Sequence, residues 1–204
     1  MLRLLLVRHA KTFANQSGCW IGQGESEITP EGFKAIDRLK EQLIGEKLDG
    51  VFTSPSRRAV CTSLQLCMPH SISEEEIHQI EALKEIHFGR FEGKNFEWVR
   101  EHEPDEIEKM LSEEANYVYP EGESLCMQHQ RVARWLHDFI QKYKEGTYLI
   151  CAHGGTIRSI LSELLIGSET LHWRFKIDPA SLTIVTLTEG YAVIETLNSK
   201  GNQV

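Results

Sequence analysis

A small set of guanidinium, imidazole and carboxyl side chains stands where apolar stretches of the chain end, and this set could bind and transfer a phosphoryl group. A phosphoryl group carries negative charge on its equatorial oxygens, and its transfer is catalysed mainly by positioning and by preorganised positive charge. Guanidinium and imidazole groups supply that charge. The residues of the set are Arg8, His9, Arg57, Arg58, Glu85, His153 and Gly154.

An imidazole and a carboxyl group of this set could divide the hydrolysis of a phosphate ester into two displacements. An unprotonated imidazole nitrogen can attack phosphorus and form a phosphohistidine. A carboxylic acid can protonate the departing alkoxide, and the resulting carboxylate can activate water for the second step, a contribution of about 10²- to 10⁴-fold. Glu85 is the best-placed carboxyl group for this role.

Apolar stretches predict the strands that must position these residues. Continuous apolar runs are typical of strands covered on both faces in a parallel sheet. Two β-rich runs joined by Glu189-Gly190 are typical of a hairpin. The stretches are residues 2–7, 48–54, 147–153 and 181–197, and together they predict at least five strands.

Four helices are predicted between these strands from their starting residues. Two of the starts combine an N-cap side chain with a proline in the first turn, which is a common way for a helix to begin. A third precedes a long amphipathic segment, and the fourth follows a strand directly. The predicted starts are Thr29-Pro30, Ser54-Pro55, Ser124 and Gly154.

The alternation of strands and helices predicts an α/β fold, a three-layer α/β/α sandwich with a mostly parallel central sheet. The ligand crevice of such a sheet lies at the carboxyl ends of the strands, so we expect His9 and His153 to meet there. The acidic stretch 89–123 has no strand pattern and predicts a helical insertion over that edge. A chain of 204 residues fits one domain, 1–204, that includes the insertion.

Each of these residues also has an ordinary structural interpretation. An Arg-His pair is often a surface turn, and a Gly-Gly pair serves turns for steric reasons alone. Arg57 and Arg58 could form a solvated helix face, and Glu85 is one of many acids. Only their ordered occurrence at predicted strand ends favours a common site.

The order and spacing of these segments resemble the histidine phosphatase superfamily, the phosphoglycerate-mutase-like proteins. The usual signature after the first strand of that family is R-H-G-x-T-x-x-N. In the second element, Arg58 rather than Arg57 matches the arginine four residues after the serine. The resemblance covers most of the chain. The segments that carry it are LLVRHAKTFAN, SPSRRAVCTS, LKEIHFGRFEG, PEGES and CAHGGTIR.

The resemblance implies a role for each matching residue. His9 would be the nucleophile, and Glu85 the proton donor and later the general base. Arginine suits a phosphate cradle because its planar fork can hold two phosphate oxygens at once. The cradle would consist of Arg8, Arg58 and His153, with His153 protonated beside the bound dianion, and substrate-binding contacts would come from Thr12, Asn15 and the backbone near Gly154.

Two features depart from the family pattern. Ala10 stands where glycine is usual. A positive φ at this position would cost the alanine roughly 1 kcal/mol, and otherwise its methyl group narrows the floor of the pocket. The loop CWIGQGESEITPEG follows the family only loosely, and its acids Glu25 and Glu27 are expected to disfavour substrates with negative charge beyond the phosphate.

The resemblance implies a metal-independent phosphomonoesterase without a cofactor, which hydrolyses a small phosphorylated metabolite through a phosphohistidine. Mutases of the superfamily typically carry E-R-H-Y-G where this chain has EIHFG, which favours hydrolysis. LKEIHFGRFEG and PEGES resemble the phosphatase lineage that includes α-ribazole phosphatase, an enzyme of cobalamin biosynthesis. A broad sugar-phosphate phosphatase, a phosphoglycerate mutase and a non-catalytic phospho-ligand binding protein stay open as alternatives.

Composition narrows the partners and the location. The formal net charge of −8 repels polyanions, which argues against nucleic acid and anionic membrane surfaces as partners. No apolar run approaches the roughly 20 residues that cross a bilayer. Five scattered cysteines without a CxxC pair favour reduced thiols in the cytoplasm. A homodimer stays open.

Overall fold

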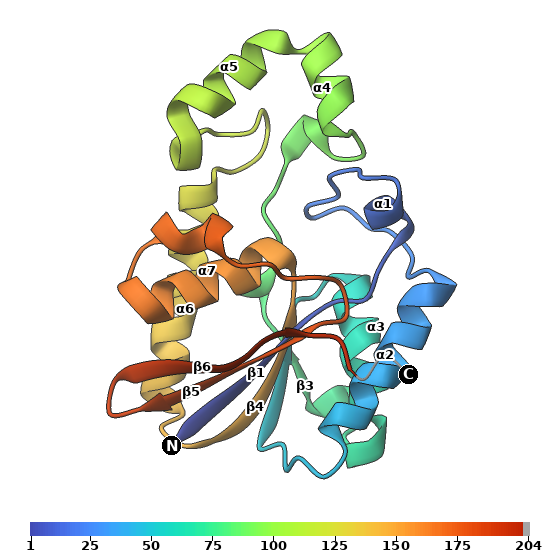
Figure 1. Ribbon diagram of the computed structural model, residues 1–204, viewed down its shortest axis with the longest axis vertical. Helices are drawn as coiled ribbons and strands as arrows, with labels where there is room; N and C mark the ends of the chain where they lie inside the picture. The colour runs from blue at the N-terminus through green and yellow to red at the C-terminus, as the bar shows by residue number, and fades with distance from the viewer. Residues whose placement is uncertain (202–204) are drawn as a thin grey trace.

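A six-stranded sheet forms the centre of the computed structural model, which describes residues 1–201 (Figure 1). The strand order across the sheet is β3-β2-β4-β1-β5-β6. The strands are β1 (Leu2–Arg8), β2 (Gly50–Thr53), β3 (Ile77–Gln79), β4 (Gly146–Ala152), β5 (Leu182–Thr188) and β6 (Tyr191–Ser199).

The sheet is mostly parallel, as the sequence predicts. β1 pairs with β4, and β2 pairs with both β3 and β4, in parallel. β5 pairs antiparallel with β1 and with β6. The register sets Arg8 of β1 opposite Ala152 of β4, so the next residues along the chain, His9 and His153, leave the sheet side by side.

Helices cover both faces of the sheet and complete the predicted three layers (Figure 1). The alternation along β1 explains why both faces are apolar. Leu4 and Leu6 belong to a core shared with α6 (Leu125–Lys142) and α7 (Gly154–Ile166). Leu5 and Val7 belong to the core shared with α2 (Pro30–Leu43) and α3 (Arg57–Cys67).

Three of the four predicted helix starts agree with the structure. The Thr29 hydroxyl accepts a hydrogen bond from Gly32 N at 3.0 Å and caps α2, with Pro30 in the first turn. The Ser124 hydroxyl accepts from Met127 N at 3.1 Å and caps α6. α7 begins at Gly154 directly after β4.

The fourth predicted start, at Ser54-Pro55, is wrong. α3 begins at Arg57, after Ser56, and Ser54 does not cap it. The Ser54 hydroxyl instead lies 2.7 Å from His153 Nε2. The Ser54 hydroxyl therefore bonds to His153 rather than to the first turn of α3, because a buried hydroxyl needs a hydrogen-bond partner.

The acidic stretch after Glu85 is helical and lies beyond the carboxyl ends of the strands (Figure 1). It contains α4 (Phe96–His102) and α5 (Pro104–Glu113), flanked by the 3₁₀ turns η4 (Gly89–Phe91) and η5 (Glu114–Asn116). The remaining short elements are α1 (Phe13–Gln16), η1 (Met68–His70), η2 (Glu74–Glu76), η3 (Glu81–Leu83) and η6 (Glu169–Arg174).

The predicted hairpin joins β5 and β6 through a two-residue turn. Glu189 has φ +51° and Gly190 has φ +85°, the pair of positive values that a type I′ turn requires. β3 was not predicted, because its three residues are too few to show a period. Among residues 1–201 the helices all fall short of the length and apolar character that a membrane span needs.

Candidate active site

Two buried imidazoles from distant parts of the chain meet at the carboxyl edge of the sheet. The ring centroids of His9 and His153 lie 5.1 Å apart, with the rings inclined at 61°. His9 N donates to Ala152 O at 2.9 Å, which ties the end of β1 to the end of β4. The parallel register therefore sets the spacing of the two rings.

The hydrogen bond at His9 Nδ1 determines which nitrogen is free to react. His9 Nδ1 lies 2.8 Å from Ala10 O, and since a carbonyl only accepts, Nδ1 carries the proton. Nε2 therefore holds the lone pair of the neutral ring. Burial, followed by the positive charges of Arg58 and Arg8, lowers the pKa of His9 well below its usual value.

His153 is also neutral in this structure, and its tautomer is the opposite one. Arg58 Nη2 lies 3.2 Å from His153 Nδ1, and an arginine only donates, so Nε2 carries the proton toward Ser54. Burial, followed by the charge of Arg58, lowers the pKa of His153 well below its usual value. If His153 became protonated beside a bound dianion, its Nδ1 could no longer accept from Arg58 Nη2 and would have to donate to another partner.

The guanidinium groups of the buried Arg58 and the half-buried Arg8 stand beside the imidazoles and are held by neutral carbonyls. Arg58 donates to Gly22 O at 2.6 Å and to Gly24 O at 2.7 Å, and Arg8 donates to Ile177 O at 2.7 Å. Burial lowers the pKa of both arginines. Their Nε atoms are buried and have no hydrogen-bond partner among residues 1–201. The oxygens of an anion would satisfy these donors.

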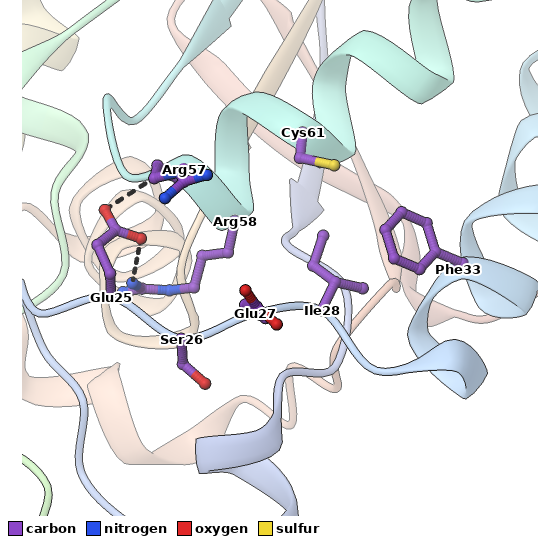
Figure 2. A pocket seen from close by; sticks show the side chains of 8 residues that line it. All are labelled: Glu25, Ser26, Glu27, Ile28, Phe33, Arg57, Arg58 and Cys61. Carbon is purple, nitrogen blue, oxygen red and sulfur yellow. Dashed lines mark hydrogen bonds and ion pairs between the residues drawn. The ribbon is translucent and has the colours of Figure 1, made fainter.

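The structure separates the two adjacent arginines that the sequence offers. Arg58 is fully buried at the site, whereas Arg57 is exposed and contributes its backbone N to Glu25 Oε1 at 3.1 Å. Glu25 Oε2 lies 4.0 Å from Arg58 Nη1. Figure 2 shows Glu25 joined to both arginines. These residues and Glu27 line a cavity of about 550 Å³.

Glu85 reaches the site from the segment after η3 and is held by three donors. Its Oε1 accepts from Gln128 Nε2 at 2.8 Å and from Ile86 N at 3.0 Å, and its Oε2 accepts from Gly155 N at 2.9 Å. A Cβ atom on Gly155 would lie 2.3 Å from Glu85 Oε1, so only glycine admits the carboxyl group there. Helices α6 and α7 thereby orient this acid.

The predicted substrate-binding residues Thr12, Asn15 and Gly154 lie at the same edge. Thr12 and Asn15 form a capping box for α1, in which Thr12 N donates to Asn15 Oδ1 at 3.1 Å. Gly154 is buried, and a Cβ atom there would lie 3.3 Å from Arg8 Cζ, so the guanidinium lies flat on this backbone. Their contacts with substrate stay a prediction.

Ala10 fits its position without the strain considered above. Its φ is not positive, and it is fully buried in the core shared with α2 and α3. Ala10 N donates to Thr62 Oγ1 at 3.1 Å. The methyl group therefore packs in the core beneath the site.

A cavity of about 710 Å³ opens beside Glu85, toward α5 and η6. One wall is aromatic and apolar, and Arg158 of α7 lines the cavity together with the acids Glu85, Glu114 and Glu169. Arg158 Nε donates to Phe175 O at 3.0 Å, and its guanidinium lies 5.3 Å from the ring centroid of Trp173.

The comparison with known proteins agrees with this geometry. A sequence model of the histidine phosphatase superfamily (branch 1) matches residues 4–200. The chain belongs to this superfamily. Together with relatives named as phosphatases, this membership shows that the protein is a phosphoric monoester hydrolase of the histidine phosphatase type.

Two relatives of this histidine phosphatase are named for different substrates. The chain is 33% identical over 199 residues to a protein of Hydrogenobacter thermophilus named "Putative phosphoserine phosphatase 2", with 97% of this chain and 96% of the relative covered. It is 24% identical over 199 residues to the adenosylcobalamin/α-ribazole phosphatase of Salmonella typhimurium, with 98% and 97% covered.

Solved structures of both kinds share the fold. A phosphoserine phosphatase of Entamoeba histolytica in complex with phosphoserine matches with a TM-score of 0.85 and 26% identity, covering 100% of each chain. The α-ribazole phosphatase of Shigella flexneri matches with a TM-score of 0.90 at 23% identity, covering 99% of this chain and 98% of that one. At the latter identity the likeness concerns the fold.

Sequence reasoning missed several residues of this histidine phosphatase. Gln128 lies one helical turn after the Ser124 cap, on the buried face of α6, and no local pattern marks it as a partner of Glu85. Gly155 was treated as a turn residue, and Arg158 as part of a motif without a role. Each matters through a contact far along the chain, which spacing alone does not reveal.

We predict that the free energy of unfolding falls steeply between pH 6.5 and pH 5. Burial lowers the pKa of His9 and His153 well below the usual value, and lowers that of His172 to about 4. The unfolded chain binds these protons near pH 6.5 and the folded chain does not. Stability is therefore full above that pH and declines below it, by about 1.4 kcal/mol per pH unit for each such histidine.

Urea unfolding of the His172→Gln variant measures one of these contributions. Its stability should decline less between pH 6 and pH 5 than that of the wild type, by about 1.4 kcal/mol per unit. His78→Gln serves as the control, since His78 is exposed. Equal slopes for the wild type and the His172 variant would contradict the prediction.

Proposed function

We propose that the chain is one histidine phosphatase domain that hydrolyses a small phosphorylated metabolite through a phosphohistidine at His9, without a metal or cofactor. The observation that carries the proposal is the meeting of His9 and His153, 5.1 Å apart, beside two guanidinium groups with buried, unsatisfied Nε donors. All five cysteines are free thiols, which supports the proposed cytoplasmic location.

In the first step His9 Nε2 attacks phosphorus. His9 Nδ1 keeps its proton and donates it to Ala10 O in a hydrogen bond. The lone pair of Nε2 therefore forms the N–P bond as the P–O ester bond breaks. Glu85, as the acid, gives its proton to the departing oxygen. Arg8, Arg58 and His153 stabilise the charge on the equatorial phosphoryl oxygens, where preorganised donors act most strongly.

In the second step water replaces the imidazole. Glu85, now a carboxylate, accepts a proton from the attacking water, whose oxygen bonds to phosphorus as the N–P bond breaks. The products are inorganic phosphate and neutral His9. Gln128 and Gly155 hold the Glu85 carboxyl group in one place for both proton transfers.

The cavity beside Glu85 supports a substrate whose leaving alcohol carries a carboxylate. Arg158 Nε donates to Phe175 O, and the two terminal nitrogens of the guanidinium make no hydrogen bond or ion pair within residues 1–201. A planar guanidinium binds a carboxylate through two parallel hydrogen bonds. Phosphoserine fits this description, and proteins named for it are among the relatives.

A second candidate is α-ribazole 5′-phosphate. The aromatic and apolar wall of the same cavity, with Phe88, Tyr117 and Tyr119, could receive a flat heterocyclic ring. A cavity of about 710 Å³ has room for such a group. The two candidates differ in whether Arg158 is needed.

The His9→Ala variant tests the nucleophile. It should form no acid-labile phosphoenzyme from a ³²P-labelled substrate, and kcat should fall at least about 10³-fold, because the imidazole that forms the N–P bond is lost. His78→Ala, at an exposed position, is the matched control. Turnover of the His9 variant at the wild-type rate would eliminate the nucleophile assignment, whereas loss of wild-type activity in EDTA would contradict the proposed metal independence.

The Glu85→Gln variant tests the proton donor. An alkyl phosphate needs a proton on its leaving oxygen, whereas p-nitrophenol leaves without one, so kcat/KM should fall about 10²- to 10⁴-fold for the alkyl phosphate and far less for p-nitrophenyl phosphate. The change keeps the size of the side chain, and its amide group replaces one of the two oxygens that accept from Gln128, Ile86 and Gly155. Equal losses on both substrates would rule out the acid role.

The Arg158→Met variant separates the two substrate candidates. Its kcat/KM for phosphoserine should fall about 10- to 100-fold, since a charge-assisted bidentate pair contributes about 1.5 to 3 kcal/mol. Its kcat/KM for phosphoethanolamine, which lacks the carboxylate, should change little. Arg174→Met, an exposed arginine of η6, is the control. The second candidate would be favoured if the wild type prefers α-ribazole 5′-phosphate and the Arg158→Met variant hydrolyses it with unchanged kcat/KM.

A further inference from the structure

The direction of the Arg58 guanidinium depends on the loop 22–24. Arg58 Nη2 donates to Gly22 O at 2.6 Å, and Nη1 donates to Gly24 O at 2.7 Å. These two carbonyls hold the guanidinium against His153, whose Nδ1 lies 3.2 Å from Nη2. A shift of either carbonyl would turn the guanidinium away from the imidazoles.

Glu92 holds the same loop from its other side. Glu92 Oε1 accepts from Gln23 N at 2.8 Å, and Oε2 accepts from Gly24 N at 2.7 Å. One carboxylate therefore grips two consecutive backbone N–H groups. Hydrogen bonds of this kind, with an ionised acceptor, are about twice as strong as neutral ones.

The hydrogen bonds from Arg58 and to Glu92 share one rigid peptide unit. The carbonyl of Gly22 and the N–H of Gln23 belong to the same peptide unit, which is planar. Glu92 binds the N–H edge of this unit and Arg58 binds its C=O edge. The position of the Glu92 carboxylate therefore determines where the carbonyl that receives Arg58 lies.

The glycines of the loop make room for this carboxylate. A Cβ atom on Gly22 would lie 2.3 Å from Glu92 Oε1, and one on Gly24 would lie 2.7 Å from Glu92 Oε2. Gly22 also has φ +47°, which side chains other than glycine rarely adopt. The sequence G-Q-G is thus matched to Glu92, which follows it by about 70 residues in sequence.

Glu92 itself is no part of the proposed chemistry. Its side chain is 18% exposed, and it lines neither the cavity beside Glu85 nor the cavity at Glu25. The imidazole of His87 approaches it, with Nε2 lying 3.8 Å from Glu92 Oε1. Its negative charge also favours the charged form of the buried Arg58.

We propose that Glu92 is a positioning residue that aims Arg58 at the phosphoryl site through the peptide unit between Gly22 and Gln23. The proposal rests on the proposed function in one respect, the membership of Arg58 in the phosphate cradle. The competing explanation is that Glu92 only fastens the loop to the segment 83–92 and stabilises the fold.

The Glu92→Gln variant tests the proposal. Glutamine keeps the size of the side chain, but its amide NH₂ faces one of the two backbone N–H donors, so the grip is lost on one side. We expect the affinity for orthovanadate, measured by calorimetry, and kcat/KM for p-nitrophenyl phosphate each to fall about 10- to 100-fold, as when a site group is displaced by about 1 Å. Glu97→Gln, an exposed carboxylate of α4, is the matched control and should change neither quantity.

A double-mutant cycle with Arg58→Ala separates aiming from mere stabilisation. If Glu92 acts through Arg58, Glu92→Gln should change vanadate affinity by less than about 2-fold once Arg58 is absent, since the two losses share one cause. Losses that multiply would overturn the proposal, as would a Glu92→Gln variant within about 2-fold of the wild type.

Two further measurements separate the possible outcomes. If Glu92→Gln unfolds below the assay temperature, Glu92→Asp replaces it in the double-mutant cycle and is judged by the same criteria. Aspartate keeps the charge and is shorter by one methylene group. A wild type that binds vanadate but turns over no phosphate ester contradicts the proposed function, and the binding cycle still judges Glu92. A wild type that does not bind vanadate overturns the aiming role.

Discussion

The parallel pairing of β1 with β4 is the constraint on which the rest of the site depends. Because Arg8 lies opposite Ala152, the residue that follows each strand leaves the sheet at the same level. Two imidazoles from positions 9 and 153 therefore meet 5.1 Å apart. A shift of β1 against β4 by one residue would turn the side chains of the shifted strand to the opposite face and separate the two rings.

The positive charges at this edge are held mainly by backbone carbonyls, with the Glu25 carboxylate 4.0 Å from Arg58 Nη1. Arg58 and Arg8 donate to backbone carbonyls, which satisfy hydrogen bonds without cancelling the positive charge. Burial makes that charge costly, as the lowered pKa values of both arginines and both imidazoles indicate. A doubly charged phosphoryl group relieves the cost in a way that a neutral ligand would not.

In the proposed function the two ends of a substrate meet different parts of the fold. The phosphoryl end would meet the strand ends of a fold that relatives named for phosphoserine and for α-ribazole share with this chain. The leaving-group end would meet the cavity beside Glu85, lined from α5, α7 and η6. On this proposal substrate choice depends on the helical segment and on Arg158, whereas the chemistry depends on the sheet.

The sequence by itself determined the layered fold, because apolar runs, N-caps and the Glu189-Gly190 turn are local signals that burial and backbone geometry impose. The chain order of motifs indicated His9, Glu85 and His153 as partners. Tertiary contacts alone set the tautomers of the two histidines and the partner of Ser54. They also set the hydrogen bonds by which Gln128 and Gly155 hold Glu85 and Glu92 holds the loop 22–24. These depend on contacts between segments tens of residues apart, and no periodicity along one segment encodes such a contact.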